Sequence, residues 1–358
     1  MASTSATTPA INGDGTLKKS QIAEHLRARI VGGELLPGAQ LPTRVELEQQ
    51  FGVSTVTVQR ALDFLVANEF VRVNGRRGTF VVQNPPHLSR YALVMSEHPV
   101  HEFRVWGRFA LALCDEVKRL ERDEDVQIAA FVGAQPHGDN EIFQKAVREV
   151  EGNRLAGLIF LNPGAYLDTP LMQDSHVARV GVGVNMKAVE GTSAINLDWA
   201  TFWDRSLEFF AASGRKKLAV LATGEWEEDA FIQKAAQRGI EIKPQWVQYV
   251  HSSPSQAARR AVHLLLSGNE RPDALLVSDD NLLESATQGI LDAKATTQVE
   301  VVSHCNFPYP TPSLLPVKRL GFDLRAVLKM CLQNIDAQQR GEIVGSDTSV
   351  TACFDDEI

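Results

Sequence analysis

The sequence predicts an α/β protein in which a small α+β segment at the N-terminus precedes a longer segment built on parallel sheets. Three observations predict this arrangement. The 358 residues suffice for two or three compact units. Before residue 83, three helical patterns are followed by two short β-rich runs around a glycine-containing turn. From residue 90 onward, apolar β-branched runs alternate with amphipathic runs of helical length.

The composition is that of a globular protein, with 44% hydrophobic and 22% charged residues. No apolar run approaches the ~18 residues that span a bilayer, so we expect no membrane contact. Residues 1–16 are rich in Ser, Thr and Ala and lack the features of a secretory signal, so we interpret them as a disordered leader of a cytoplasmic protein. Four widely spaced cysteines, without the paired spacing of zinc or redox sites, predict reduced thiols, no metal and no cofactor.

The first helix is predicted by apolar residues that recur every four positions. Ile22, Leu26 and Ile30 form this stripe, and two consecutive glycines end the helix near residue 32. Because such a stripe has to be buried, the helix is expected to pack on another element.

A second and a third helix are predicted by their caps. Thr43 is placed to cap a helix over residues 44–51, and Gly52 permits a tight turn after it. Ser54 can then cap a third helix that runs to about residue 68. The inward stripe of this helix is Val58, Ala61, Leu62 and Leu65, and its outward residues are Val56, Gln59, Arg60 and Asp63.

A β-hairpin tipped with two arginines follows the third helix. The runs at 70–74 and 79–82 are rich in β-forming residues, and residues 74–78, Asn-Gly-Arg-Arg-Gly, are typical of a hairpin turn. The three helices and this hairpin together predict a winged helix-turn-helix.

Charge is divided unevenly along the chain. The net charge is -8 overall, yet residues 17–82 hold nine basic and six acidic residues, a net charge of +3. The rest of the chain is correspondingly acidic. A basic head on an acidic body suits a protein that binds DNA with one end only.

Residues 17–82 closely resemble the GntR-type winged helix-turn-helix. The matching runs are Gly33-Glu34-Leu35-Leu36-Pro37-Gly38, Leu41-Pro42-Thr43, Glu46-Leu47, Phe51-Gly52-Val53-Ser54, Thr57-Val58, Arg60-Ala61-Leu62 and Gly78-Thr79-Phe80-Val81. The resemblance implies a DNA-binding domain of a transcription regulator. The alternative is an ordinary small helical domain with solvated arginines.

The resemblance implies a role for each part of this head. The caps Thr43 and Ser54 would receive phosphate oxygens. On the third helix, Gln59 would contact adenine and Arg60 guanine in the major groove, or both would contact phosphate only. The two hairpin arginines would enter a minor groove. The predicted DNA-binding residues are Thr43, Arg44, Ser54, Thr55, Val56, Thr57, Gln59, Arg60, Gly75, Arg76 and Arg77.

Three positions depart from the family pattern. Many relatives carry arginine where this chain has Val45, Thr55 and Gln59, and Arg44 is the candidate to replace one of them. The operator sequence therefore cannot be taken over from the family.

Residues 83–89 contain two prolines and predict a semi-rigid linker, after which residues 90–358 form the larger domain. The predicted strands are 91–95, 126–132, 155–161, 177–184, 218–223, 246–250, 274–278, 299–303 and 348–354. The predicted helices are 106–120, 141–151, 202–213, 228–238, 255–266, 282–293 and 323–337. Repeated units of this kind form parallel sheets covered by helices.

The larger domain resembles the LacI/GalR effector domain, which is itself similar to periplasmic sugar-binding proteins. The resemblance is carried by Val182-Gly183-Val184-Asn185, Gly214-Arg215-Lys216-Lys217-Leu218-Ala219-Val220-Leu221, Arg271-Pro272-Asp273-Ala274-Leu275-Leu276-Val277-Ser278-Asp279-Asp280 and Val301-Val302-Ser303. It implies two α/β lobes, with a small-molecule effector bound between them and dimerisation through this domain.

Ligands of such sheets lie at the carboxyl ends of the strands. The effector-binding candidates at these positions are Ser96, Glu97, His98, Asn162, Asn185, Glu225, Trp226, Asp280 and Asn306. Polar groups with a tryptophan face suit a sugar or a related polar metabolite. Residues 225–229 are Glu-Trp-Glu-Glu-Asp where sugar-binding relatives usually place an arginine, and this acidity does not favour an anionic ligand.

The two resemblances together imply a homodimeric repressor on a pseudo-palindromic operator, controlled by its effector. Two alternatives come from other classes. One is an aminotransferase-like fusion that binds pyridoxal phosphate, although no lysine lies in a recognisable cofactor context. The other is a small-molecule binding protein without DNA activity.

Overall fold

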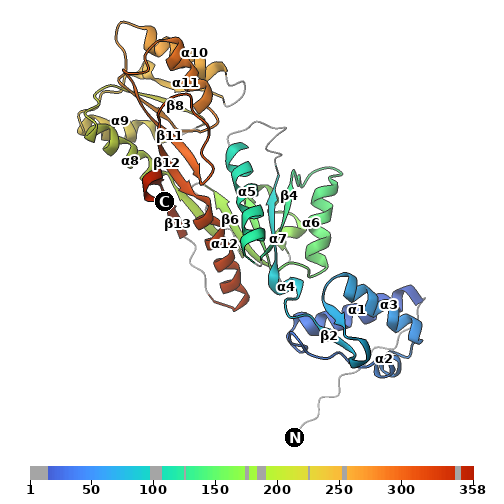
Figure 1. The fold of residues 1–358 in the computed structure, drawn as a ribbon. Helices are drawn as coiled ribbons and strands as arrows, with labels where there is room; N and C mark the ends of the chain where they lie inside the picture. The colour runs from blue at the N-terminus through green and yellow to red at the C-terminus, as the bar shows by residue number, and fades with distance from the viewer. Residues whose placement is uncertain are drawn as a thin grey trace. The chain divides into compact units, whose positions relative to one another are not determined.

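The computed structural model describes residues 15–96, 107–124, 126–173, 177–183, 191–224, 226–251, 256–342 and 348–358. The chain divides into two compact units (Figure 1). The first comprises residues 1–90 with 149–156, and the second comprises 91–148 with 157–358.

The first unit contains a winged helix-turn-helix. Its helices are α1 (Gly15–Val31), α2 (Arg44–Phe51) and α3 (Thr55–Ala67), and its antiparallel hairpin consists of β1 (Val71–Val73) and β2 (Thr79–Val81). Their core is formed by Ile22, Ala23, Leu26, Ile30, Leu35, Leu41, Leu47, Val58, Ala61, Leu62, Leu65, Phe70, Val71 and Val81. The predicted helices, the hairpin and the inward stripe of the third helix are confirmed.

The caps of α2 and α3 form as the sequence predicts. Thr43 and Glu46 make a capping box, in which the Glu46 amide donates to the Thr43 hydroxyl and the Thr43 amide donates to the Glu46 carboxylate. Gly52 ends α2 in the left-handed region, with φ 60°. The Ser54 hydroxyl accepts a hydrogen bond from the Thr57 amide at the start of α3.

The segment predicted as a linker holds one helical turn. Helix α4 (Pro86–Ser89) begins with proline at its first position, where the missing amide proton costs nothing. The His87 ring is buried and stacks on Phe70 with their centroids 5.9 Å apart. Because burial disfavours the charged imidazolium, the pKa of His87 is lowered to about 4.

Two six-stranded sheets form the two lobes of the second unit. The first has the order β13-β7-β6-β5-β3-β4 and the second the order β14-β12-β11-β10-β8-β9. The first sheet consists of β3 (Arg90–Met95), β4 (Gln127–Val132), β5 (Gly157–Leu161), β6 (Ala178–Gly183), β7 (Ser193–Asp198) and β13 (Thr348–Thr351). The second consists of β8 (Leu218–Ala222), β9 (Val247–Tyr249), β10 (Ala274–Val277), β11 (Glu300–Phe307), β12 (Lys318–Asp323) and β14 (Cys353–Phe354).

Helices connect these strands, so the predicted parallel two-lobe architecture is confirmed. They are α5 (Gly107–Asp123), α6 (Glu141–Glu151), α7 (Pro170–Gln173), α8 (Trp199–Ala212), α9 (Glu228–Gln237), α10 (Gln256–Ser267), α11 (Leu283–Asp292) and α12 (Leu324–Gln339). Helix α12 follows a strand of the second sheet but contacts β6 and β7 of the first. The chain therefore returns to the first lobe through α12.

The strand predictions near these crossovers are partly wrong. The run at 348–354, predicted as one strand, forms β13 in the first sheet and β14 in the second. Strands β7 and β12 were not predicted, and β11 extends four residues past the predicted end at 303, to Phe307. The partners of β13 and β14, which are β7 and β12, are distant in sequence, so no local pattern divides the run at 348–354 between two sheets.

Glycine explains why β12 escaped prediction. A Cβ on Gly321 would lie 1.8 Å from the carbonyl oxygen of Cys305 on the neighbouring strand, so no larger residue fits there. In a sequence, glycine inside a short run is typical of a turn, whereas here it permits close approach of two backbones. None of the helices in the described part of the chain is long and apolar enough to cross a membrane.

Candidate nucleic-acid interface and ligand site

The outer face of α3 is exposed, as a recognition helix requires. Val56 is 60% exposed, and the side chains of Arg60 and Asp63 are exposed beside it. The Gln59 amide nitrogen donates to Asp63 Oδ1 over 2.6 Å, which leaves the amide oxygen of Gln59 as its outward acceptor.

The two predicted phosphate-binding caps differ in their availability. The Thr43 hydroxyl donates to the Glu46 carboxylate over 2.9 Å, and the hydrogen bonds from Thr43 lower the pKa of Glu46. A phosphate at this cap would therefore meet a carboxylate. At the other cap, the Ser54 and Thr57 hydroxyls lie 3.1 Å apart, with no acidic partner among the described contacts. Ser54 is thus the better placed of the two caps.

The hairpin tip presents the two predicted arginines. Gly75–Arg77 form a single 3-10 turn, and both arginine side chains are exposed. The Gln40 side-chain amide donates to the Arg77 carbonyl over 3.0 Å, and a Cβ on Gly78 would come within 2.8 Å of that amide nitrogen. Gln40 therefore fixes the tip, and glycine at position 78 makes room for it.

The arginines of residues 17–82 fall into two groups. Arg27 and Arg29 on α1 form ion pairs with Glu24 and Glu34. In contrast, the arginines on α2, α3 and the hairpin form no ion pair with any described residue; they are Arg44, Arg60, Arg72, Arg76 and Arg77. Unpaired guanidinium groups are available to DNA phosphates.

A buried polar cluster lies at the carboxyl ends of β10 and β11 in the second sheet. Asp280 Oδ2 accepts hydrogen bonds from Asn306 Nδ2 at 3.0 Å and from the Thr311 hydroxyl at 3.1 Å. His304 Nδ1 lies 3.7 Å from Asp280 Oδ1. All four side chains are buried, so the predicted residues Asp280 and Asn306 meet in one place.

A second carboxylate adjoins this cluster. Asp279 accepts hydrogen bonds from the Thr223 hydroxyl and from the Asn281 amide. Burial first, and then the neighbouring Asp280, raises the pKa of Asp279. No lysine or arginine among the described residues forms an ion pair with either aspartate.

Three tryptophans, here called the tryptophan row, extend from the polar cluster. They are Trp199 and Trp203 on α8 and Trp226 before α9. Trp226 stacks on Trp203 at 4.6 Å between ring centroids, and Trp199 lies 5.9 Å from Trp203. Trp199 also stacks on His304 at 5.0 Å. The row therefore links predicted Trp226 to predicted Asp280 and Asn306.

Sequence reasoning missed Trp199, Trp203, His304 and Thr311. The spacing of Trp199 and Trp203 by four residues at the start of α8 places both on one helical face and could have indicated them. His304 lay beyond the predicted end of β11. Thr311 lies in an irregular loop after the strand, where no pattern marks it.

Four buried polar atoms in this region have no hydrogen-bond partner among the described residues. They are Trp199 Nε1, Trp226 Nε1, His304 Nε2 and Asn306 Oδ1. Since buried polar groups are nearly always hydrogen-bonded, such a concentration makes this region the candidate ligand site of the second unit.

The other predicted effector-binding residues are not linked to the polar cluster by contacts between described residues. Ser96 follows β3 and is partly buried, and Asn162 follows β5, is exposed and has φ 60°. No hydrogen bond between described residues joins either to the polar cluster. Glu97, His98, Asn185 and Glu225 lie outside the described residues.

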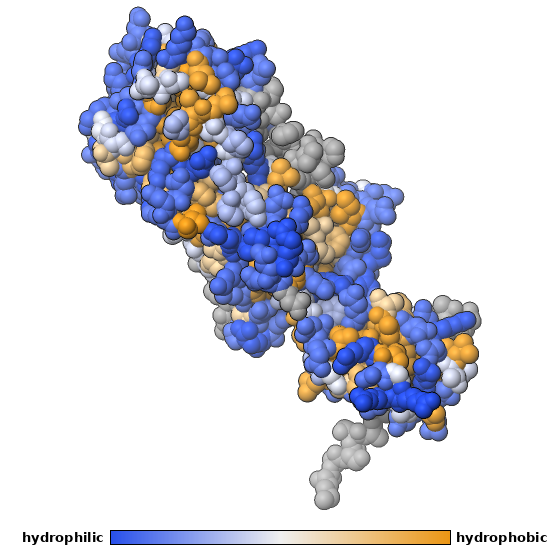
Figure 2. Space-filling view, in the orientation of Figure 1, coloured by the Kyte–Doolittle hydropathy of each residue, from blue (hydrophilic) through white to orange (hydrophobic). Residues whose placement is uncertain are grey.

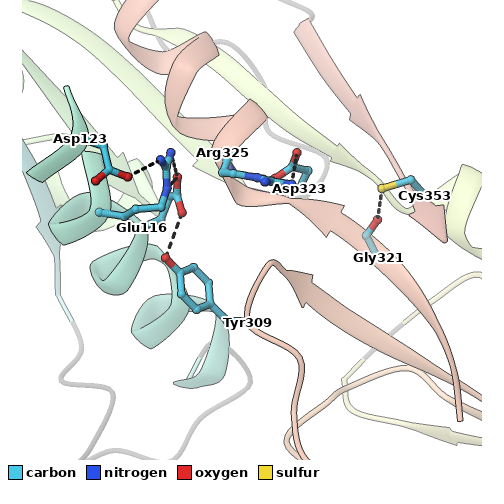
Figure 3. A network of polar contacts seen from close by, with 8 residues as sticks. Glu116, Asp123, Tyr309, Gly321, Asp323, Arg325 and Cys353 are labelled. Carbon is cyan, nitrogen blue, oxygen red and sulfur yellow. Dashed lines mark hydrogen bonds and ion pairs between the residues drawn. The ribbon is translucent and has the colours of Figure 1, made fainter. Parts of the chain in front are cut away.

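A hydrogen bond connects the two lobes near the carboxyl end of β11. Tyr309, in the loop after β11, donates to Glu116 Oε2 on α5 over 3.0 Å, and Arg119 pairs with the other oxygen of Glu116 at 2.6 Å (Figure 3). Helix α5 packs on β4 and α12 of the first lobe. Burial, followed by the contact with Glu116, raises the pKa of Tyr309 to about 12.

Comparison with known proteins gives different relatives for the two units. Residues 18–81 match the model of the bacterial regulatory proteins of the gntR family. The mannosyl-D-glycerate transport/metabolism system repressor MngR of Escherichia coli is 46% identical over 61 residues, and the HTH-type transcriptional repressor NagR of Bacillus subtilis is 47% identical over 62 residues. These matches cover 17% of this chain and 25% of each relative, so the chain spans about a quarter of the length of the curated relatives it matches.

The second unit has the fold of LacI-family regulators. A LacI family transcriptional regulator from Lactobacillus casei with bound glucose aligns over 74% of this chain and 98% of its own, with a TM-score of 0.53 and 13% identity. At that identity the likeness establishes the fold alone. The predicted gntR-type head and the predicted LacI-like fold are both confirmed.

Proposed function

We propose that this chain is a sequence-specific, DNA-binding transcription regulator controlled by a small polar effector. One observation carries the DNA-binding part: two capped helices and a braced hairpin present arginines with no ion-pair partner among the described residues. The match to the gntR model over residues 18–81 supports it, since the matched residues span α2, α3 and the hairpin.

Each part of the head has a proposed role. The Ser54 cap binds a phosphate, and the exposed side chains of α3 enter the major groove. Arg76 and Arg77 enter the adjacent minor groove, where negative potential attracts them. The protein binds a pseudo-palindromic operator as a homodimer, because two-fold symmetry doubles these contacts. MngR and NagR are both named repressors, which favours repression as the outcome.

The effector binds at the polar cluster and the tryptophan row. Sugars combine C–H faces, which stack on tryptophan, with hydroxyl groups that both donate and accept hydrogen bonds. Such a ligand would satisfy the donors Trp199 Nε1 and Trp226 Nε1 and the acceptor Asn306 Oδ1. Two buried aspartates without a lysine or arginine partner among the described residues disfavour an anionic group at this point. A neutral carbohydrate therefore suits the site best.

Effector control then follows from lobe movement. A ligand that favours one arrangement of the lobes shifts the population toward it. The Tyr309–Glu116 hydrogen bond is one contact whose geometry depends on that arrangement. Coupling of this kind changes DNA affinity by ~1 to 3 kcal/mol.

Selection of genomic fragments by the purified protein tests the DNA-binding proposal. We expect enrichment of a small set of fragments that share a two-fold related motif, and their neighbouring genes would identify the effector's pathway. A Gln59→Ala variant should change the preference at one base position of that motif. If no fragment is enriched above the input, the proposal is wrong.

Tryptophan fluorescence tests the effector site. We expect a saturable change with at least one sugar from a panel of neutral mono- and disaccharides that includes glucose and sucrose. Asn306→Ala should abolish the response and Trp226→Phe should reduce it, whereas Trp246→Phe, a buried tryptophan outside the row, should retain it. A response that survives Asn306→Ala would place the ligand elsewhere.

A further inference from the structure

Val56 is an exposed apolar side chain near the start of α3, and the residues beside it on the proposed DNA-binding face are polar. It is the second residue of α3, two positions after the Ser54 cap, and it is 60% exposed. The core of the first unit is filled by other side chains, and Val56 is not part of it. Figure 2 shows that hydrophobic residues lie among strongly hydrophilic ones on the visible face of the first unit.

The neighbours of Val56 on α3 are polar. Gln59 and Arg60 follow it by three and four residues, which places them on the same helical face one turn later. Asp63 holds the Gln59 amide nitrogen, and Arg60 has no ion-pair partner among the described residues. Val56 thus forms the apolar end of a stripe whose other members can bind phosphates and base edges.

The major groove offers one methyl group on its base edges, the 5-methyl group of thymine, and the atoms that distinguish the other bases there are hydrogen-bond donors and acceptors. The N-terminal residues of a recognition helix are those that contact base edges. Opposite a cytosine or guanine, Val56 would leave a desolvated polar group without a partner, whereas thymine gives apolar contact.

We propose that Val56 selects a thymine in each half of the operator by contact with its 5-methyl group. This inference rests on the proposed DNA-binding function. It assigns specificity to a residue that can form no hydrogen bond through its side chain. Charge complementarity supports DNA as the binding partner of this face. The arginines of α2, α3 and the hairpin that lack an ion-pair partner among the described residues suit the phosphates that flank such a thymine.

Deoxyuridine substitution tests the proposal, because uracil keeps the hydrogen-bonding edge of thymine and lacks only the methyl group. Each thymine of the selected operator is replaced in turn by deoxyuridine in both half-sites, and the affinity of the full-length protein is measured by fluorescence anisotropy. We expect one position at which uracil weakens wild-type binding about fourfold per half-site, as the loss of one buried methyl group predicts.

The Val56→Ala variant completes the test. It should bind the thymine operator more weakly than the wild type and should no longer distinguish uracil from thymine at that position. Val66→Ala, a substitution of a 38% exposed valine near the other end of α3, is the matched control and should keep the full discrimination. Circular dichroism of each variant checks that the fold is kept.

The outcomes separate this inference from the proposed function. If the protein selects an operator but tolerates uracil at every position, or if Val56→Ala still discriminates, the role of Val56 is wrong and DNA binding stands. If no operator is selected at all, both the DNA-binding proposal and this inference are wrong.

Discussion

The proposed DNA-binding surface of the first unit and the proposed ligand site of the second are built in opposite ways. The first lies within about forty consecutive residues, 43–81, is exposed, and is held by contacts between near neighbours such as Thr43 with Glu46. The second gathers Trp199, Asp280, Asn306 and Thr311 from segments separated by up to 112 residues and buries most of them. Local signals specify the first surface, whereas sheet topology assembles the second.

The largest expected effect comes from a substitution that disrupts the packing of two neighbouring strands in the second unit. Gly321→Ala places a methyl group 1.8 Å from the Cys305 carbonyl oxygen, so β11 and β12 must separate. We expect the second unit to lose about 3 kcal/mol or more of stability. Tryptophan fluorescence in urea measures this unit selectively, because all five tryptophans lie beyond residue 105.

Gly268→Ala is the control for this substitution. Its added Cβ would meet its nearest neighbour, the Glu270 carbonyl oxygen, at 3.8 Å, an ordinary contact. It should leave the urea midpoint nearly unchanged. Equal midpoints for Gly321→Ala and the wild type would contradict the packing described for β12.

A pH titration should act on the first unit instead. The pKa of His87 is about 4 in the folded protein, against 6.5 when exposed, so the unfolded chain binds the extra proton between these values. Stability is therefore unaffected above pH 6.5 and falls as the pH drops below it, by about 2 kcal/mol between pH 7 and pH 5. Urea unfolding followed by far-ultraviolet circular dichroism at both pH values measures the loss.

His87→Leu removes the titrating group and keeps an apolar side chain against Phe70. This variant should lose the part of the pH dependence that belongs to the first unit. If its stability falls with pH as steeply as that of the wild type, the His87 ring is not the group that titrates.

A smaller effect is expected where the two lobes meet. Tyr309→Phe removes the donor to the buried Glu116 carboxylate, which keeps only its contacts with Arg119. We expect a loss of about 1 kcal/mol in the stability of the second unit. Tyr249→Phe is the matched control, since Tyr249 is 55% exposed and its partner Glu228 is solvated. Equal losses of stability in the two variants would show that the Tyr309–Glu116 hydrogen bond contributes no more than an exposed one.

The smallest effect concerns single phosphate contacts. Arg76→Ala should weaken binding to every DNA sequence and lower the slope of log affinity against log salt by ~1. Arg29→Ala removes an arginine that is already paired with Glu34 and should leave the slope unchanged. Anisotropy titrations between 50 and 200 mM salt distinguish them, and identical slopes for both variants would contradict the role proposed for the hairpin arginines.

The same contrast explains what the sequence could and could not predict. Helix α2 begins and ends where its cap and Gly52 predict, because each signal lies within four residues of its target. Strand β12 was missed because Gly321 is required by Cys305, sixteen residues away on another strand. Asp280 and Asn306 were found at strand ends, but their contact with each other and with His304 depends on the pairing of β10 with β11.

The most direct test of the central claim compares the selected operator with a shuffled fragment of equal length and composition. Anisotropy titrations of the full-length protein at 150 mM salt should show at least a ~1000-fold preference for the operator, the usual margin of specific over non-specific binding. Both affinities should fall with salt. Equal affinities for the two fragments would contradict the claim that the first unit recognises a DNA sequence.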